Sequence, residues 1–171
     1  MSAAECWFSS FRTARNGLHH LFQAGFDPAF AALAEDALPP LRLAGFAICD
    51  KVDEAVCKAR GLSAPEKVVV DNTVCYRCKT AAPTDGFDEV RLVLSSDRHI
   101  VGVIGILRFG DKAACERKAK ELAAKYKAEL AKRETAAGMM VFEVNYGTKS
   151  VEVSLASAAH ARLSAKAAAA W

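Results

Sequence analysis

Two cysteines separated by two residues, Cys75 and Cys78, are the feature of this sequence best suited to chemistry. Such a pair can bind one side of a tetrahedral zinc ion, but a structural zinc site needs two pairs and the chain offers one. A redox dithiol needs the pair at the start of a helix, and Pro83 and Gly86 leave no room for one. We therefore expect structural thiols and no cofactor. Zinc at Cys75 and Cys78, or a disulfide to another of the six cysteines, is the alternative.

Cys115 is a third candidate thiol. It falls in the first turns of a predicted long helix, where the partial positive charge of the helix end favours a thiolate. It also falls on the apolar stripe of that helix, which favours a buried core side chain. The pattern leaves a thiol-based redox enzyme or sensor, using Cys75 and Cys78 or Cys115, as an alternative function.

The second half of the chain has the alternation of an antiparallel sheet. Val90, Leu92 and Leu94 alternate along one predicted strand, and a turn at 95–98 leads to an apolar partner strand at 99–109. On an extended strand residues three apart point to opposite faces, so Cys75 and Cys78 should do so as well. The later elements are a helix capped by Asp111 and running to about Ala137, strands at 139–146 and 151–155, and a helix at 156–170.

This ββα–ββα order predicts an α+β domain. The natural arrangement is a four-stranded antiparallel sheet with both helices packed on one face. The strand at 100–107 is apolar on both sides, so the other face needs a cover from the N-terminal half or from a partner.

The region before these strands is harder to assign. Asp50 is the predicted N-cap of a short helix that ends before Arg60-Gly61, with Gly61 in the left-handed position that follows the helix. The β-branched run at 67–74 predicts a strand.

Residues 1–40 predict an N-terminal helical hairpin that ends at Pro39-Pro40, and residues 41–171 predict the α+β domain. The hairpin has more aromatic side chains than the packing between its two helices requires, and exposed aromatic side chains are typical of interfaces. The interface candidates are Trp7, Phe8, Phe11, Phe22 and Phe26. Alternatively, this hairpin covers the free face of the sheet.

Composition narrows the class of protein. The net charge of +3 is too small to indicate a nucleic-acid-binding surface. No apolar run is long enough for a transmembrane segment, and the first 30 residues show no secretory signal. We therefore expect a soluble, cysteine-rich protein that is intracellular or organelle-resident.

The function favoured by these patterns is a non-catalytic protein-interaction module or accessory subunit of a larger assembly, with a protein partner. Besides the thiol-based enzyme, a second alternative is a small-molecule-binding domain. Its site would lie between the sheet and the helix at 112–137, with Tyr126 and Arg108 as polar contacts.

Overall fold

The computed structural model describes residues 41–133, 138–157, 160–169 and 171. The hairpin predicted at 1–40, with its five candidate interface aromatics, lies outside these residues, so it and the boundary at residue 40 stay predictions.

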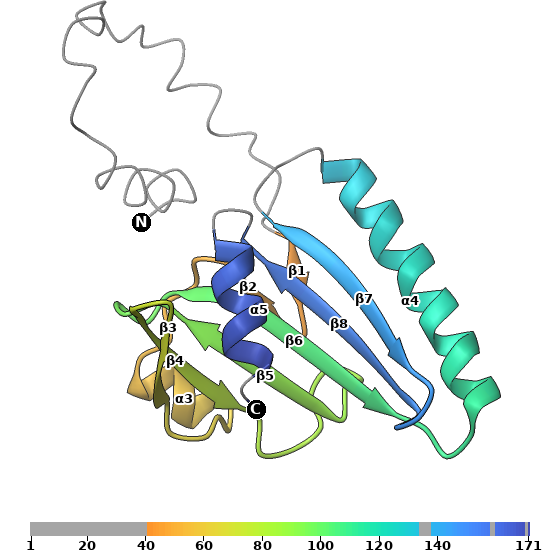
Figure 1. Cartoon of the computed structure of the whole chain (residues 1–171), viewed down its shortest axis with the longest axis horizontal. Coiled ribbons are helices and arrows are strands. Elements are labelled where there is room, and N and C mark those ends of the chain that lie inside the picture. The colour runs from red at the N-terminus through yellow and green to blue at the C-terminus, as the bar shows by residue number, and fades with distance from the viewer. Residues whose placement is uncertain (1–40, 134–137, 158–159, 170) are drawn as a thin grey trace, which may run out of the picture. The chain divides into compact units, whose positions relative to one another are not determined.

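The described chain forms a six-stranded antiparallel sheet with the strand order β3-β4-β5-β6-β8-β7 (Figure 1). The α+β class and the antiparallel sheet are therefore confirmed. The sheet is wider than the predicted four strands because the β3–β4 hairpin joins it beside β5. The strands are β3 (Glu66–Val70), β4 (Thr73–Lys79), β5 (Glu89–Leu94), β6 (Ile100–Arg108), β7 (Met139–Asn145) and β8 (Ser150–Ala156).

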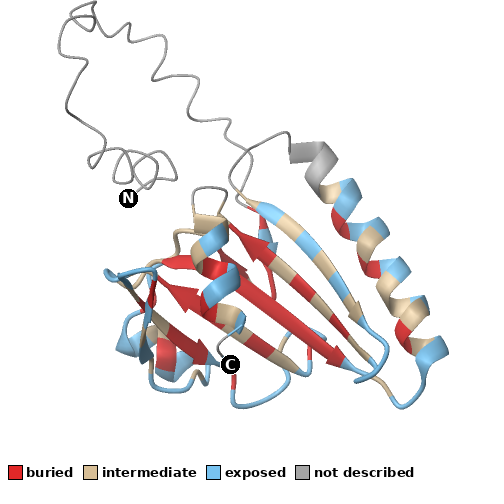
Figure 2. Ribbon diagram, viewed as in Figure 1, coloured by how far each residue is buried: buried red, intermediate tan, exposed pale blue. Residues whose placement is uncertain are grey.

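The sheet has a back face and a front face, defined here by side chains of β5 and β6. Leu92 and Val103 point to the back, into the main hydrophobic core, whereas Val93 and Val101 point to the front, into a smaller cluster. The back face is packed by the short hairpin β1 (Arg42–Leu43) and β2 (Phe46–Ala47), by α3 (Glu54–Ala59) and by α4 (Lys112–Arg133). Figure 2 shows the buried residues concentrated along the central strands, with alternating exposure along β7.

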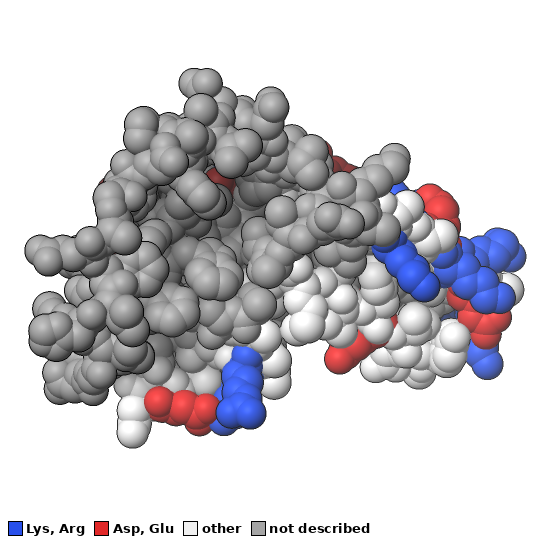
Figure 3. All heavy atoms as spheres, turned by 90° about the horizontal axis from the view of Figure 1, so that it is seen from above, with Lys and Arg blue, Asp and Glu red and all other residues white. Residues whose placement is uncertain are grey.

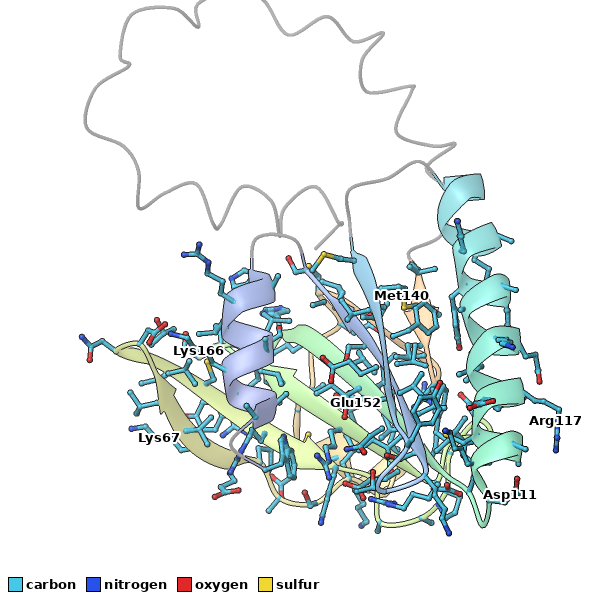
Figure 4. All side chains as sticks on the ribbon, turned by 45° about the vertical axis from the view of Figure 1, so that its right-hand side comes forward. Lys67, Asp111, Arg117, Met140, Glu152 and Lys166 are labelled. Carbon is cyan, nitrogen blue, oxygen red and sulfur yellow. The ribbon has the colours of Figure 1, made fainter. Side chains whose placement is uncertain are left out.

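The front face is packed by α5 (Ala161–Ala169) alone among the described elements, so the two predicted helices lie on opposite faces rather than on one (Figures 1 and 4). Small side chains explain this position. The Ser164 hydroxyl donates a hydrogen bond to the Val101 carbonyl at 2.9 Å. A Cβ on Gly102 would lie 2.8 Å from the Ser164 Oγ atom. Because Gly102 has no Cβ atom, α5 lies close against the front of β6. The helix therefore covers part of the front face of the sheet.

The short helix α3 begins later than predicted. The side chain of Asp53, not of Asp50, accepts the N–H of Val56 at 2.9 Å and caps the helix. Asp50 instead accepts the N–H of Ala47 at 3.2 Å and so stabilises the end of the β1–β2 hairpin. Gly61 does have the predicted left-handed conformation, with a φ of +59°.

The caps and faces of the later elements agree with their sequence pattern. Asp111 accepts the N–H of Ala114 at 2.7 Å and caps α4. Met140, Phe142 and Val144 point from β7 to the back core, as alternation along the strand requires. Tyr146 does not join them, because the strand ends at Asn145 and its side chain is exposed.

Candidate functional site

The three candidate thiols are buried, and the sheet separates Cys75 from the other two. Cys78 points to the back core, as does Cys115 from α4. Cys75 pairs with Val68, which packs against the front cluster, so Cys75 and Cys78 lie on opposite faces as predicted. All three are free thiols, so neither half of the C-x₂-C pair forms a disulfide. Among the described residues no group of three side chains could hold a metal ion, and the pair cannot share one from opposite faces.

Burial also disfavours the thiolates that redox chemistry needs. It raises the pKa of Cys78 to about 12, with a further contribution from the neighbouring Cys57 that Arg98 partly offsets. Burial raises the pKa of Cys75 as well. At neutral pH these side chains are therefore protonated and behave as small apolar core residues.

We expect Cys75 and Cys78 to resist alkylation by iodoacetamide in the native protein at about pH 8 and to react rapidly in denaturant. Peptide mass spectrometry after a timed exposure reports each cysteine separately. Native labelling of Cys78 as fast as labelling of the unfolded chain would contradict its burial.

Charged side chains cross the front face outside the area that α5 covers. Glu89 binds Arg91 at 2.6 Å and Arg108 at 2.8 Å. Burial alone would raise the pKa of Glu89, but hydrogen bonds from the two arginines outweigh it and the pKa lies below its ordinary value. Glu89 is therefore ionised, and it ties β5 to β6.

The front face also carries two groups of like charge. Arg77, Lys79 and Arg91 gather on β4 and β5 around the indole ring of Trp171, and we name them the cationic cluster. Glu143 on β7 lies directly opposite Glu152 on β8, and we name these two the carboxylate pair. Figure 4 places Glu152 on the sheet, away from the back-face helix α4. The cationic cluster, with Glu66 as the ion-pair partner of Arg77, lies toward the β3 edge of the sheet, and the carboxylate pair lies toward the β7 edge.

The carboxylate pair is electrostatically strained. Burial raises the pKa of Glu152, and repulsion from Glu143 raises it further, while Arg91 and a hydrogen bond with Ser154 act in the opposite direction. Like charges directly opposite each other destabilise a strand pair. A cation beside Glu143 would relieve this repulsion.

We expect Glu152→Gln to be more stable than the parent protein at neutral pH. A carboxyl whose pKa is raised by folding disfavours the folded state once it is ionised, so the parent regains stability as the pH falls toward the unfolded pKa of about 4.3. Thermal unfolding of both proteins from neutral to acidic pH should show a gap that closes on acidification. Glu121→Gln, at an exposed site on α4, is the control. A stability difference that does not change with pH would contradict a raised pKa of Glu152.

The outer edge of β7, which pairs with no described strand other than β8, completes this face. Met139 is 45% exposed and Val141 is 38% exposed, and both point to the front because Met140 and Phe142 point to the back. The helix α4 contacts β7 through back-face side chains, including Tyr126 on α4, whose ring lies 6.1 Å from that of Phe142. Seen from above in Figure 3, the described surface mixes Lys and Arg with Asp and Glu.

The structure does not bring together Tyr126 and Arg108, the two polar contacts expected for a small-molecule site between the sheet and the helix at 112–137, and binding at such a site stays a prediction. Tyr126 is buried in the back core, whereas Arg108 binds Glu89 on the front face. The sheet separates the two side chains, so they cannot contact one ligand.

Sequence reasoning missed the cationic cluster and the carboxylate pair. Strand alternation could have placed Glu143 opposite in direction to Phe142, but pairing Glu143 with Glu152 needs the β7–β8 register. The cluster needs the β4–β5 register and the position of Trp171, which no local pattern contains.

Comparison with known proteins adds no relative: no family model, curated protein or solved structure matches this chain. Within the described residues, no helix has the length and apolar character needed to cross a membrane.

Proposed function

We propose that this chain is a protein-interaction module, an accessory subunit that binds an extended segment of a partner protein along the free edge of β7. The observation that carries the proposal is the composition of this edge strand. β7 is apolar and regular, with Glu143 as its one charged residue and no proline. It pairs with β8 at all seven positions and with no other described strand.

An edge strand has unpaired backbone N–H and C=O groups that can form hydrogen bonds with another strand. Proteins commonly protect an edge with lysine, proline, a bulge or a short strand. The opposite edge of the sheet fits that rule: β3 has five residues, of which Glu66 and Lys67 are charged. Within the described part of the chain β7 has no lysine, no proline and no bulge and is longer than β3, so strand addition at β7 is the interaction that the sheet favours.

The side chains beside this edge indicate the chemistry of the partner. Exposed Met139 and Val141 favour apolar neighbours on the front face. The carboxylate pair favours a lysine or arginine beside Glu143, since opposite charges on adjacent strands attract and the pair lacks a counter-charge of its own beyond Arg91. We therefore propose that the partner segment is extended, with alternating apolar residues and one basic residue.

A synthetic peptide of the length of β7, with alternating valine and threonine and one central lysine, tests the proposal. Hydrogen exchange of the full chain should show slower exchange of β7 amides when the peptide is bound, and unchanged exchange at β3. Protection at β3 in place of β7, or no protection at any peptide concentration, would argue against the edge. Self-association through β7, detected by sedimentation without peptide, would replace the partner by a second copy of the chain.

A further inference from the structure

We propose that the cationic cluster is a binding site for a phosphate monoester group, covered in this structure by Trp171. The cluster consists of Arg77, Lys79 and Arg91 on the front face of β4 and β5. It uses no residue of the β7 edge, so it stands or falls independently of the proposed function.

Arg77 has unused hydrogen-bond donors in a buried position. The residue is 7% exposed, and its Nη2 atom donates to the Glu66 carboxylate at 3.0 Å. Its Nε and Nη1 atoms are buried and have no hydrogen-bond partner among the described residues. Buried polar groups are nearly always hydrogen-bonded, so two partnerless nitrogens on one guanidinium indicate a missing acceptor. The side chain of Glu66 is 65% exposed and engages only the third nitrogen.

The cluster also has more positive charge than its carboxylates balance. Lys79 and Arg91 are directly opposite in the β4–β5 register, an arrangement that destabilises a sheet when both side chains carry the same charge. Arg91 shares Glu89 with Arg108, and Lys79 forms no ion pair within the described chain. An acceptor with two negative charges would therefore be better suited to this site than a single carboxylate.

The indole ring of Trp171 lies against the three cations, but it supplies neither a hydrogen-bond acceptor for Arg77 nor a negative charge. The centre of its indole ring lies 4.8 Å from the Cζ atom of Arg77 and 5.1 Å from that of Arg91, and 6.0 Å from the Lys79 Nζ atom. The face of an aromatic ring attracts cations, but it accepts no hydrogen bond from Nε or Nη1 in the guanidinium plane. The residue is 37% exposed and follows the end of α5 at Ala169, so the ring can be displaced without opening the back core.

A phosphate monoester matches these features. It carries between one and two negative charges near neutral pH and has three acceptor oxygens, and arginine is the side chain best shaped to bind it. The acceptor would bond the free nitrogens of Arg77, and Lys79 and Arg91 would neutralise its charge. The indole ring would move from its position over the guanidinium.

Fluorescence of Trp171 provides the test. The chain has two tryptophans, so Trp7→Phe leaves Trp171 as the single reporter. Inorganic phosphate, phosphoserine and adenosine monophosphate are titrated separately at constant ionic strength, with thermal unfolding as a second readout. We expect a saturable change in Trp171 emission and a rise in Tm with ligand concentration. A response to all three shows recognition of the phosphate group itself, and a response to one carrier identifies the source.

Three variants separate the site from general charge effects. Arg77→Met should weaken binding by about thirtyfold or more, as expected when one partner of a buried charged pair is truncated. Lys79→Met should also weaken it, and it keeps the test usable if the Arg77 variant does not fold. Lys67→Met is the matched control, because Lys67 on β3 pairs with Tyr76, whose ring packs toward the back core.

Four results would overturn the proposal. They are the absence of a saturable response to any of the three ligands, retention of the response in folded Arg77→Met, equal weakening by Lys67→Met, and an equal response to potassium chloride. The last would show ionic strength alone acting on the indole ring.

Discussion

Leu92→Ala is expected to lower the free energy of unfolding by about 2–5 kcal/mol. Leu92 lies on the central strand β5, is 0% exposed and points into the back core between the sheet and its covering elements. Alanine removes apolar contacts and leaves a cavity that neighbouring strands cannot close, because their hydrogen-bonded register fixes them.

Val69→Ala on β3 is the matched control for this change. Its side chain is 64% exposed, so its loss should alter the free energy of unfolding by no more than about 0.5 kcal/mol. Urea denaturation followed by circular dichroism measures both values. Equal losses at the two positions would contradict the burial of Leu92 in the core.

Gly105→Ala is expected to cost about 1–3 kcal/mol, although alanine is only one methyl group larger. A Cβ on Gly105 would lie 2.6 Å from the Cδ1 and Cε1 atoms of Phe87, whose ring packs against the bare backbone of β6. Phe87 is 4% exposed, so the ring cannot swing out without losing its own burial. The added methyl group must therefore move either the ring or the strand.

Gly110→Ala and Phe87→Ala are the comparisons for this second prediction. A Cβ on Gly110 would meet no atom within 4 Å, so that change should be nearly neutral. The cost of Gly105→Ala should fall in a Phe87→Ala background, because the overlapping ring is absent and the two changes are coupled. A cost that is the same in both backgrounds would mean that Phe87 does not cause it.

Several elements of this fold follow from local sequence, but the way they are combined does not. The single strand predicted at 67–74 is wrong, because the left-handed backbone of Asp71 and Asn72 turns the chain between β3 and β4. Alternation at Val90, Leu92 and Leu94 predicts a strand, and the structure confirms it, because each side chain's direction depends only on its own backbone. The capping role of Asp111 is equally local. The choice between Asp50 and Asp53 as a helix cap is not, since it depends on the β1–β2 hairpin, which engages Asp50 first.

The cationic cluster could not be predicted from the sequence, because its residues come together through strand pairing and the packing of α5. Cys75 and Cys78 have the spacing of a chemical motif, yet strand geometry places them on opposite faces and burial keeps them protonated. Arg77, between them in the sequence, is the residue with unused donors. Its role depends on Trp171, which is distant in the sequence and reaches the cluster only because α5 packs on the front face.

Reversal of the charge at position 143, by Glu143→Lys, is the most direct test of strand addition at β7. Binding of the lysine-containing peptide, and of the same peptide with glutamate in place of lysine, is measured by fluorescence anisotropy. The full-length parent protein is compared with Glu143→Lys and with the control Val69→Lys on the opposite edge. We expect the parent and Val69→Lys to prefer the lysine peptide, and Glu143→Lys to prefer the glutamate peptide, since cross-strand charge pairs fix the preference. An unchanged preference in Glu143→Lys would contradict strand addition beside Glu143.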